Sequence, residues 1–304
     1  WELESSLLIR WTGRARRALV LMSHQDVVPA GGVWRYPPFS GTIADGKLWG
    51  RGTMDVKGNL YCIFKALDEL IAEGYTPAWD IYIATSHEEE VGGNDLIVNF
   101  LRDELKVTPE LLIDEGSAVQ LFTADGLSRV FAMVSVAEKG YLDVRCVARS
   151  RGGHSSAPQK WSPLPRLGAF MCEIEEHELF PLRMNAASAE MYRRLAAYGE
   201  TPEQREKFLA LAAQKPGWQA LLTEQERNLL ATTCVFTMAS GSSAANVIPQ
   251  EASVTCNIRL APGETVQDVL DAMRPYAEKH GIELQPQRAE EASPITDPCG
   301  SEFA

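Results

Sequence analysis

The sequence lacks the features that mark several common classes of protein. Its six cysteines are far apart and include no C-x-x-C pair, so neither a zinc ribbon nor a dense disulfide framework is indicated. No apolar run approaches the roughly 18–20 residues that a membrane-spanning helix needs, and the first residues carry no signal-peptide pattern. A single basic cluster occurs at residues 10–17, and a solvated hairpin tip explains it better than a binding surface.

Charge and composition describe an acidic, globular chain. Of its 304 residues, 41 are Asp or Glu and 29 are Lys or Arg, which gives a formal net charge of −12. This balance argues against nucleic acid or an anionic membrane as a partner, because both require clustered positive charge. Hydrophobic residues at 45% and charged residues at 23% allow a large core, and the length favours two domains.

The first half of the chain alternates apolar runs with amphipathic segments, as βαβ units do. Strands are predicted at residues 18–24, 79–87 and 110–116, with helices at 59–74 and 92–105. The pattern changes near residue 137, where alternating strands replace the apolar runs. About 70 residues, 161–230, are rich in helix formers and predict an inserted helical segment.

Four polar clusters follow predicted strands: His24 with Asp26, Asp55 in "GRGTMDVKG", residues 88–90 in "SHEEEVGG", and Asp114 in "LLIDEG". One His-x-Asp pair is more often the polar end of a buried strand than a metal site, but four clusters at one sheet edge favour a ligand site. Converging glutamates repel one another unless a cation compensates, whereas the same run on a surface helix would be a solvated face. Imidazole with carboxylates suits zinc, with cobalt or manganese as alternatives.

Other motif readings fail on inspection. The segment "HEEEV" is not H-E-x-x-H, because Val91 stands where the second histidine belongs. In "GRGTMDVKG", Asp55 occupies the place of the third glycine of a dinucleotide loop, and no G-K-[ST] follows.

In this order and spacing, "SHQDVVP", "GRGTMDVKG", "SHEEEVGG" and "IDEG" resemble the di-zinc metallopeptidase superfamily of aminoacylase, carboxypeptidase S and succinyl-diaminopimelate desuccinylase. The segments "EKGYLDV" and "GGHSSAP" look most similar to the carboxypeptidase S branch. The resemblance implies an α/β fold in which a mixed β-sheet flanked by helices forms a catalytic metal-binding domain in residues 1–137. It also implies an inserted α+β lid and dimerisation domain in 138–286, and the start of a return to the catalytic domain in 287–304.

Roles in the metal centre follow from the resemblance. His24 and Asp114 would hold one zinc ion, Glu90 the other, and Asp55 would bridge both. Glu89 would be the general base, acting on a water shared by the two ions.

Asp26 would support this centre by accepting the other ring N–H of His24. In the lid, the resemblance makes His154 the oxyanion-stabilising histidine, supplied across a homodimer interface; otherwise it is a surface histidine. Asn246 and Arg259 would hold the substrate, with Arg259 gripping its carboxylate, whereas turn chemistry and a surface salt bridge are the plainer interpretations.

The family also places a last histidine ligand of the second metal beyond residue 304. His280 belongs by pattern to a lid helix, and His87 and His177 are expected to be ordinary histidines. The expectation is therefore either a fragment of a longer protein or an impaired site. A missing N-terminal segment leaves the compartment open.

The implied activity is hydrolysis of the amide bond of small peptides of the Gly-X type by water bridging two zinc ions. An N-acyl amino acid amidohydrolase shares every catalytic residue and stays open as an alternative. So does a non-catalytic module that binds amino acids or peptides through an incomplete metal site.

Overall fold

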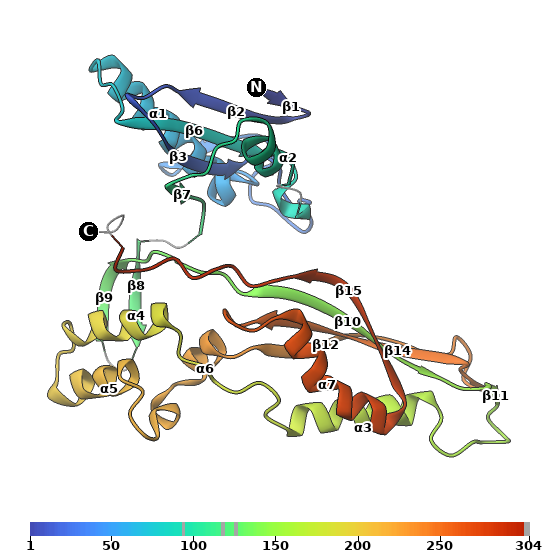
Figure 1. The fold of residues 1–304 in the computed structure, drawn as a ribbon. Helices are drawn as coiled ribbons and strands as arrows, with labels where there is room; N and C mark the ends of the chain where they lie inside the picture. Colours follow the sequence, from blue (N-terminus) through green and yellow to red (C-terminus); the bar gives the residue numbers. More distant parts are fainter. Residues whose placement is uncertain (93–94, 117–118, 125–126, 301–304) are drawn as a thin grey trace. The chain divides into compact units, whose positions relative to one another are not determined.

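The fold is taken from a computed structural model that describes residues 1–92, 95–116, 119–124 and 127–300. The chain divides into two units, which we call unit 1 (Trp1–Ser117) and unit 2 (Ala118–Ala304) (Figure 1). This division lies before the domain boundary expected near residue 137, and the three-part domain organisation stays a prediction.

Unit 1 is built on a five-stranded sheet of order β1-β2-β6-β3-β7. Its strands are β1 (Glu2–Leu3), β2 (Ser6–Trp11), β3 (Ala15–His24), β6 (Trp79–Ser86) and β7 (Leu111–Ile113). Strands β6, β3 and β7 run parallel to one another, whereas β2 pairs antiparallel with both β1 and β6. The sheet is therefore mixed, as predicted.

Helices cover both faces of this sheet. Successive side chains of a strand point to opposite sides, and the apolar side chains on each side pack against a different helical segment. Helix α1 (Gly58–Ala72) packs on Leu19, Leu21, Ile81 and Ile83. Helix α2 (Asp95–Asn99) and the helical turn η3 (Phe100–Glu104) pack on the other face, against Ala18, Val20, Met22, Tyr82 and Ala84. The central strands read as continuous apolar runs because neither face is exposed. Residues 93–94, near the start of the helix predicted at 92–105, lie outside the described residues.

Short elements complete unit 1. Strands β4 (Thr42–Ala44) and β5 (Lys47–Trp49) form a hairpin. The helical turn η1 (Thr53–Lys57) precedes α1, and the turn η2 (Glu89–Val91) follows β6. Gly74, with φ of 73°, ends the α1 segment in a left-handed conformation that glycine adopts without strain.

Unit 2 contains an antiparallel sheet of order β12-β14-β10-β15. The strands are β10 (Gly140–Arg149), β12 (Thr233–Ser240), β14 (Glu251–Leu260) and β15 (Ile282–Glu290). Helices α3 (Pro163–Glu176) and α7 (Val266–His280) lie along one face of it (Figure 1) and bury Phe170 and Met273 in the shared core. This arrangement is α+β, and it completes the predicted fold class.

A second cluster of unit 2 joins a hairpin to helices. Strands β8 (Val119–Ala124) and β9 (Leu127–Ala132) form the hairpin, and α4 (Ala186–Ala196), α5 (Pro202–Ala212), η4 (Trp218–Leu221) and α6 (Glu224–Leu230) are the helices. Leu127 packs with Tyr192 and Phe208 in one apolar core. Short strands β11 (Gly153–His154) and β13 (Val247–Ile248) pair at another point of the unit. The segment predicted to return to the first domain ends in residues 301–304, which lie outside the described residues.

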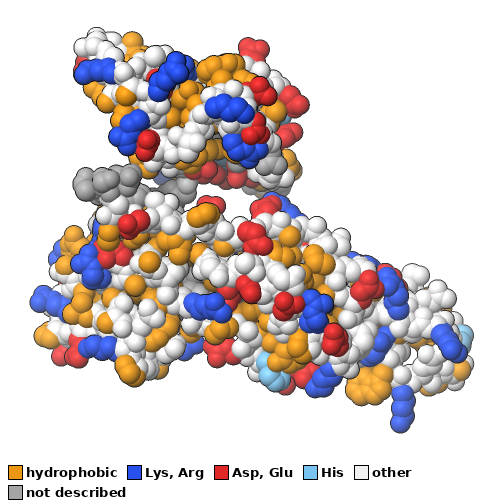
Figure 2. Space-filling model, viewed as in Figure 1, with side chains coloured by type: hydrophobic (Ala, Val, Ile, Leu, Met, Phe, Trp, Pro, Cys, Tyr) orange, Lys and Arg blue, Asp and Glu red, His pale blue; other side chains and the backbone are white. Residues whose placement is uncertain are grey.

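Surface charge is mixed on the face drawn in Figure 2, where Lys and Arg side chains lie among Asp and Glu. Within the described ranges, no helix combines the length and the hydropathy that crossing a bilayer requires.

Candidate metal centre

Strand ends of unit 1 carry a cluster of one histidine and several carboxylates. His24 is the last residue of β3, Glu89 and Glu90 lie in η2 after β6, and Glu115 follows β7. Asp55 comes from η1, before α1. Because β3, β6 and β7 are parallel neighbours, their carboxyl ends meet at one sheet edge, where ligands bind in open α/β sheets.

The imidazole of His24 is the centre of this cluster, and the side chain is 2% exposed. Its Nε2 lies 3.1 Å from Asp55 Oδ1, 3.4 Å from Glu115 Oε2 and 3.8 Å from Glu89 Oε2. His24 belongs to two groups of possible metal ligands, one with Asp55 and Glu90 and one with Glu89 and Glu115. Within each group the donor atoms all lie within 4.8 Å of one another. The structure thus brings together four of the predicted residues and adds a fifth.

Asp26 contacts both the imidazole of His24 and the turn that carries Glu89 and Glu90. The Nδ1 of His24 lies 3.1 Å from the backbone oxygen of Asp26 and 3.3 Å from its Oδ1. The same carboxylate accepts the backbone N–H of Glu89 at 3.3 Å and that of Glu90 at 3.0 Å. One side chain therefore orients the imidazole and also holds the turn that carries both glutamates.

The donor set fits a metal ion. With a hydrogen on Nδ1 facing Asp26, the Nε2 lone pair of His24 points at carboxylate oxygens, and this arrangement is repulsive unless a cation or a proton lies between them. Nitrogen from imidazole together with carboxylate oxygen suits zinc.

Burial and charge set the pKa values of the cluster. Burial raises the pKa of Glu89, and the charges of Glu90 and Asp26 raise it further, against a lowering by His24. Burial likewise raises the pKa of Glu115, with Glu89 adding to the rise. For His24, burial lowers the pKa, but the hydrogen bond to Asp55 and the charge of Glu115 outweigh it, so the pKa is raised. Beside burial, the negative charge of neighbouring carboxylates contributes to each of these raised pKa values, and a bound cation would offset that charge.

At this sheet edge Glu115, rather than the expected Asp114, approaches His24. Asp114 is exposed, accepts the backbone N–H of Glu115 at 2.9 Å, and belongs to neither donor group around His24 among the described residues. Glu115 reaches His24 instead. Since β7 ends at Ile113, the turn after it decides which carboxylate faces the cluster, and the only sequence signal was that two carboxylates are adjacent. The ligand role of Asp114 stays a prediction.

The remaining predicted residues lie in unit 2. His154, in β11, is exposed and its Nδ1 lies 2.8 Å from Ser156 Oγ. The ladder between β11 and β13 holds it near Asn246, whose backbone oxygen accepts the N–H of Ser155 at 3.0 Å. Arg259, on β14, is exposed and its guanidinium carbon lies 4.5 Å from the centroid of the Tyr141 ring. Their roles toward substrate stay predictions.

Comparisons with known sequences agree on one group of proteins. A family model described as "Peptidase family M20/M25/M40" matches residues 20–215. The chain is similar to "Probable carboxypeptidase S-like 2" of Dictyostelium discoideum, at 34% identity over 277 residues, covering 88% of this chain and 53% of that protein. It is also similar to "N-fatty-acyl-amino acid synthase/hydrolase PM20D1" of Mus musculus, at 32% identity, covering 91% and 56%. The chain thus spans about half the length of these curated relatives.

Solved structures share the fold. The M20 family metallo-carboxypeptidase Sso-CP2 from Sulfolobus solfataricus matches with a TM-score of 0.64 at 19% identity, covering 95% of this chain and 68% of that one. Human carnosine dipeptidase 1 matches with a TM-score of 0.59 at 16% identity, covering 98% and 67%.

Proposed function

Because the chain belongs to the peptidase family M20/M25/M40, which confirms the family predicted from its motifs, we propose that it is a metal-dependent hydrolase of amide bonds. The observation that carries the proposal is the convergence of His24, Asp55, Glu89, Glu90 and Glu115 at one sheet edge. A silent binding module has no evident use for the additional carboxylate of a general base.

His24, Asp55, Glu90 and Glu115 would hold the metal, with Glu115 in the position for which Asp114 was expected. Zinc, in one or two ions, would supply a more acidic water and would polarise the scissile carbonyl. Asp26 would keep the imidazole of His24 in the tautomer whose Nε2 is available to bind the metal.

Glu89 is the proposed general base. Its side chain is half-buried beside the ligands, and burial raises its pKa, which makes the carboxylate a stronger proton acceptor. Glu89 takes a proton from the attacking water and passes it to the leaving amine.

The proposed substrates are small peptides of the Gly-X type, and N-acyl amino acids are the second candidate class. Relatives in the two groups carry the names "Probable carboxypeptidase S-like 2" and "N-fatty-acyl-amino acid synthase/hydrolase PM20D1". Both kinds of substrate present an amide bond next to a free carboxylate. Arg259 has an exposed guanidinium that can bind such a carboxylate in a bidentate manner. We assign oxyanion stabilisation to His154, supplied within a homodimer, and substrate positioning to Asn246.

The test compares the zinc-loaded protein with its Glu89→Gln variant. Hydrolysis of Gly-X dipeptides and N-acyl amino acids is measured with and without a chelator, and bound zinc is measured by elemental analysis. We expect chelator-sensitive hydrolysis by the parent, and a variant that keeps its zinc and loses turnover. Glu73→Gln, an exposed change at the end of α1, is the matched control.

The outcomes separate the alternatives. Near-normal turnover by Glu89→Gln would show that Glu89 is not the general base. Binding of these compounds by the parent with no chelator-sensitive hydrolysis would favour the non-catalytic module.

A further inference from the structure

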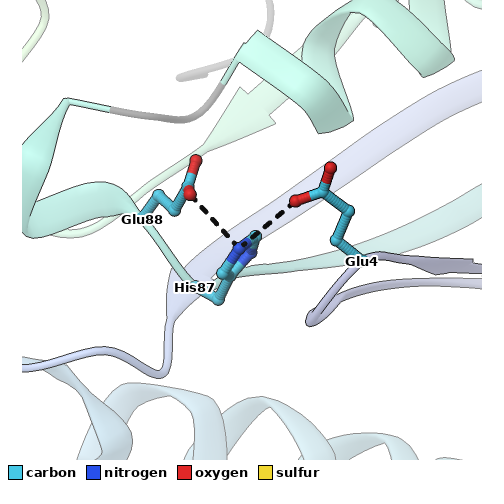
Figure 3. Close-up of side chains that lie close together, drawn as sticks. All are labelled: Glu4, His87 and Glu88. Carbon is cyan, nitrogen blue, oxygen red and sulfur yellow. Dashed lines mark ion pairs between the residues drawn. The ribbon is translucent and has the colours of Figure 1, made fainter.

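A second group of metal-binding side chains lies in unit 1 outside the cluster around His24. Glu4, in the turn between β1 and β2, and His87 and Glu88, directly after β6, have donor atoms within 4.8 Å of one another. The Nε2 of His87 lies 3.4 Å from Glu88 Oε1 and 3.9 Å from Glu4 Oε2. Figure 3 shows both carboxylates pointing at the same ring from two sides.

A buried serine orients the imidazole of His87. Ser6 is 3% exposed, and its Oγ lies 2.7 Å from His87 Nδ1. The same oxygen accepts a hydrogen bond from the backbone N–H of His87 at 3.2 Å. The ring is thus held through the nitrogen that faces the protein, and its other nitrogen is directed at the carboxylates. Metal-binding histidines donate their second ring N–H to an acceptor, and in the tautomer in which His87 Nδ1–H donates to Ser6 Oγ the Nε2 lone pair faces the carboxylates.

Charge in this group is unbalanced. Among the residues that the structure describes, His87 is the sole ion-pair partner of Glu4 and of Glu88. A neutral imidazole has at most one N–H to offer on the side facing the carboxylates. A divalent cation would satisfy both carboxylates and the ring nitrogen together.

The spacing also fits. Metal–ligand bonds of about 2.0–2.1 Å in a tetrahedron place neighbouring donor atoms roughly 3.3–3.4 Å apart. The pair His87–Glu88 already has a separation of 3.4 Å, and Glu4, whose side chain is 72% exposed, is free to move the remaining few tenths of an ångström.

We propose that Glu4, His87 and Glu88 bind a zinc ion separate from the metal centre around His24. The fourth coordination position is open to water, since both glutamate side chains reach the surface. The ion joins the β1–β2 turn to the chain segment that continues into Glu89 and Glu90. It therefore restrains the turn that carries the proposed general base, without contributing to the chemistry.

Zinc stoichiometry of the whole 304-residue chain tests the proposal. The parent, Glu4→Gln, Glu88→Gln and the double variant are equilibrated with the same free zinc, and bound metal is measured by elemental analysis. Each single variant is expected to lose one equivalent, and the double variant no more than one, because both ligands serve the same ion. Glu2→Gln, an exposed neutralisation on β1 two residues before Glu4, should lose none.

Two further measurements keep the result independent of folding and of catalysis. Far-UV circular dichroism checks that each variant is folded, and cobalt substitution should show that Glu4→Gln loses visible absorption that Glu2→Gln retains. In the Asp55→Asn background, which weakens the centre around His24, Glu4→Gln should still remove one equivalent. If zinc content and cobalt absorption are the same in parent, Glu4→Gln and Glu88→Gln, the group is an ion pair and the proposal is wrong, whatever the hydrolysis assays give.

Discussion

Asp26→Asn changes one carboxylate oxygen into an amide nitrogen and leaves the size of the side chain almost unaltered. In the protein both oxygens are used: Oδ1 faces His24 Nδ1 and the N–H of Glu89, and Oδ2 accepts the N–H of Glu90. An asparagine can present its oxygen to one of these positions only, and its NH₂ group then meets a donor at the other. At least one hydrogen bond to a charged acceptor is lost in either orientation.

The size of the effect follows from this count. A hydrogen bond to a charged group contributes about 1.5–3 kcal/mol, and about 1.36 kcal/mol corresponds to a factor of ten. Zinc affinity should therefore fall roughly 10- to 150-fold, in line with the 10- to 100-fold typical of a lost partner of a ligand histidine. Competition with a chelating dye measures it.

Asp68→Asn is the matched control, because Asp68 lies on the exposed side of α1. If Asp26→Asn and Asp68→Asn bind zinc with equal affinity, Asp26 does not orient the ligands, and the tautomer assigned to His24 loses its support.

The remaining predictions concern one ligand, one core residue and one ion pair. Glu115→Gln should weaken zinc binding by roughly tenfold or more, and Asp114→Asn should have the smaller effect; the reverse order in a dye competition would restore Asp114 as the ligand. Phe170→Ala, at a side chain with no exposed surface, should lower the free energy of unfolding of unit 2 by about 3–5 kcal/mol in urea titrations, and a loss as small as that of the half-exposed Leu209→Ala would contradict it. Two arginines follow Glu190 on α4, and their hydrogen bonds to its carboxylate lower the pKa of Glu190 from 4.5 to about 2. The stability they contribute is complete above pH of about 4.5 and is lost as the pH falls through about 2, so the difference in melting temperature between parent and Glu190→Gln should shrink over that interval. A difference that stays constant there would exclude this pair as its cause.

Unit 1 could be predicted from the sequence in most of its features. The apolar runs before His24 and before Ser86 predict buried neighbouring strands, and the structure confirms both strands and the helix of residues 58–72 between them. These signals are local, since periodicity along the chain reflects which side of each element is covered.

Most members of the candidate metal centre could be predicted from the sequence, but their detailed arrangement could not. Motif order was enough to expect His24, Asp55, Glu89 and Glu90 in one place, and the structure brings them together. No local rule distinguishes two adjacent carboxylates after a strand end, so Glu115 was missed.

His87 illustrates what sequence patterns do not contain. It was expected to be an ordinary histidine, because its contacts with Ser6 and Glu4 depend on the antiparallel pairing of β2 with β6, in which Leu7 opposes Thr85. Register between strands distant in sequence is set by packing of the whole sheet. In unit 2 the docking of Leu127 against Tyr192 is similarly non-local.

The strand order β6-β3-β7 also bears on how the protein folds. Apart from Asp26, the nearest partner of His24 along the chain is Asp55, 31 residues away, and the other carboxylates arrive only when β6 and β7 pair with β3. Parallel pairing needs long crossovers, and contacts of that kind form slowly because loop closure precedes them. We therefore expect metal uptake by the His24 cluster to be a late event in refolding. The metal would stabilise a sheet that has already formed and would not nucleate it.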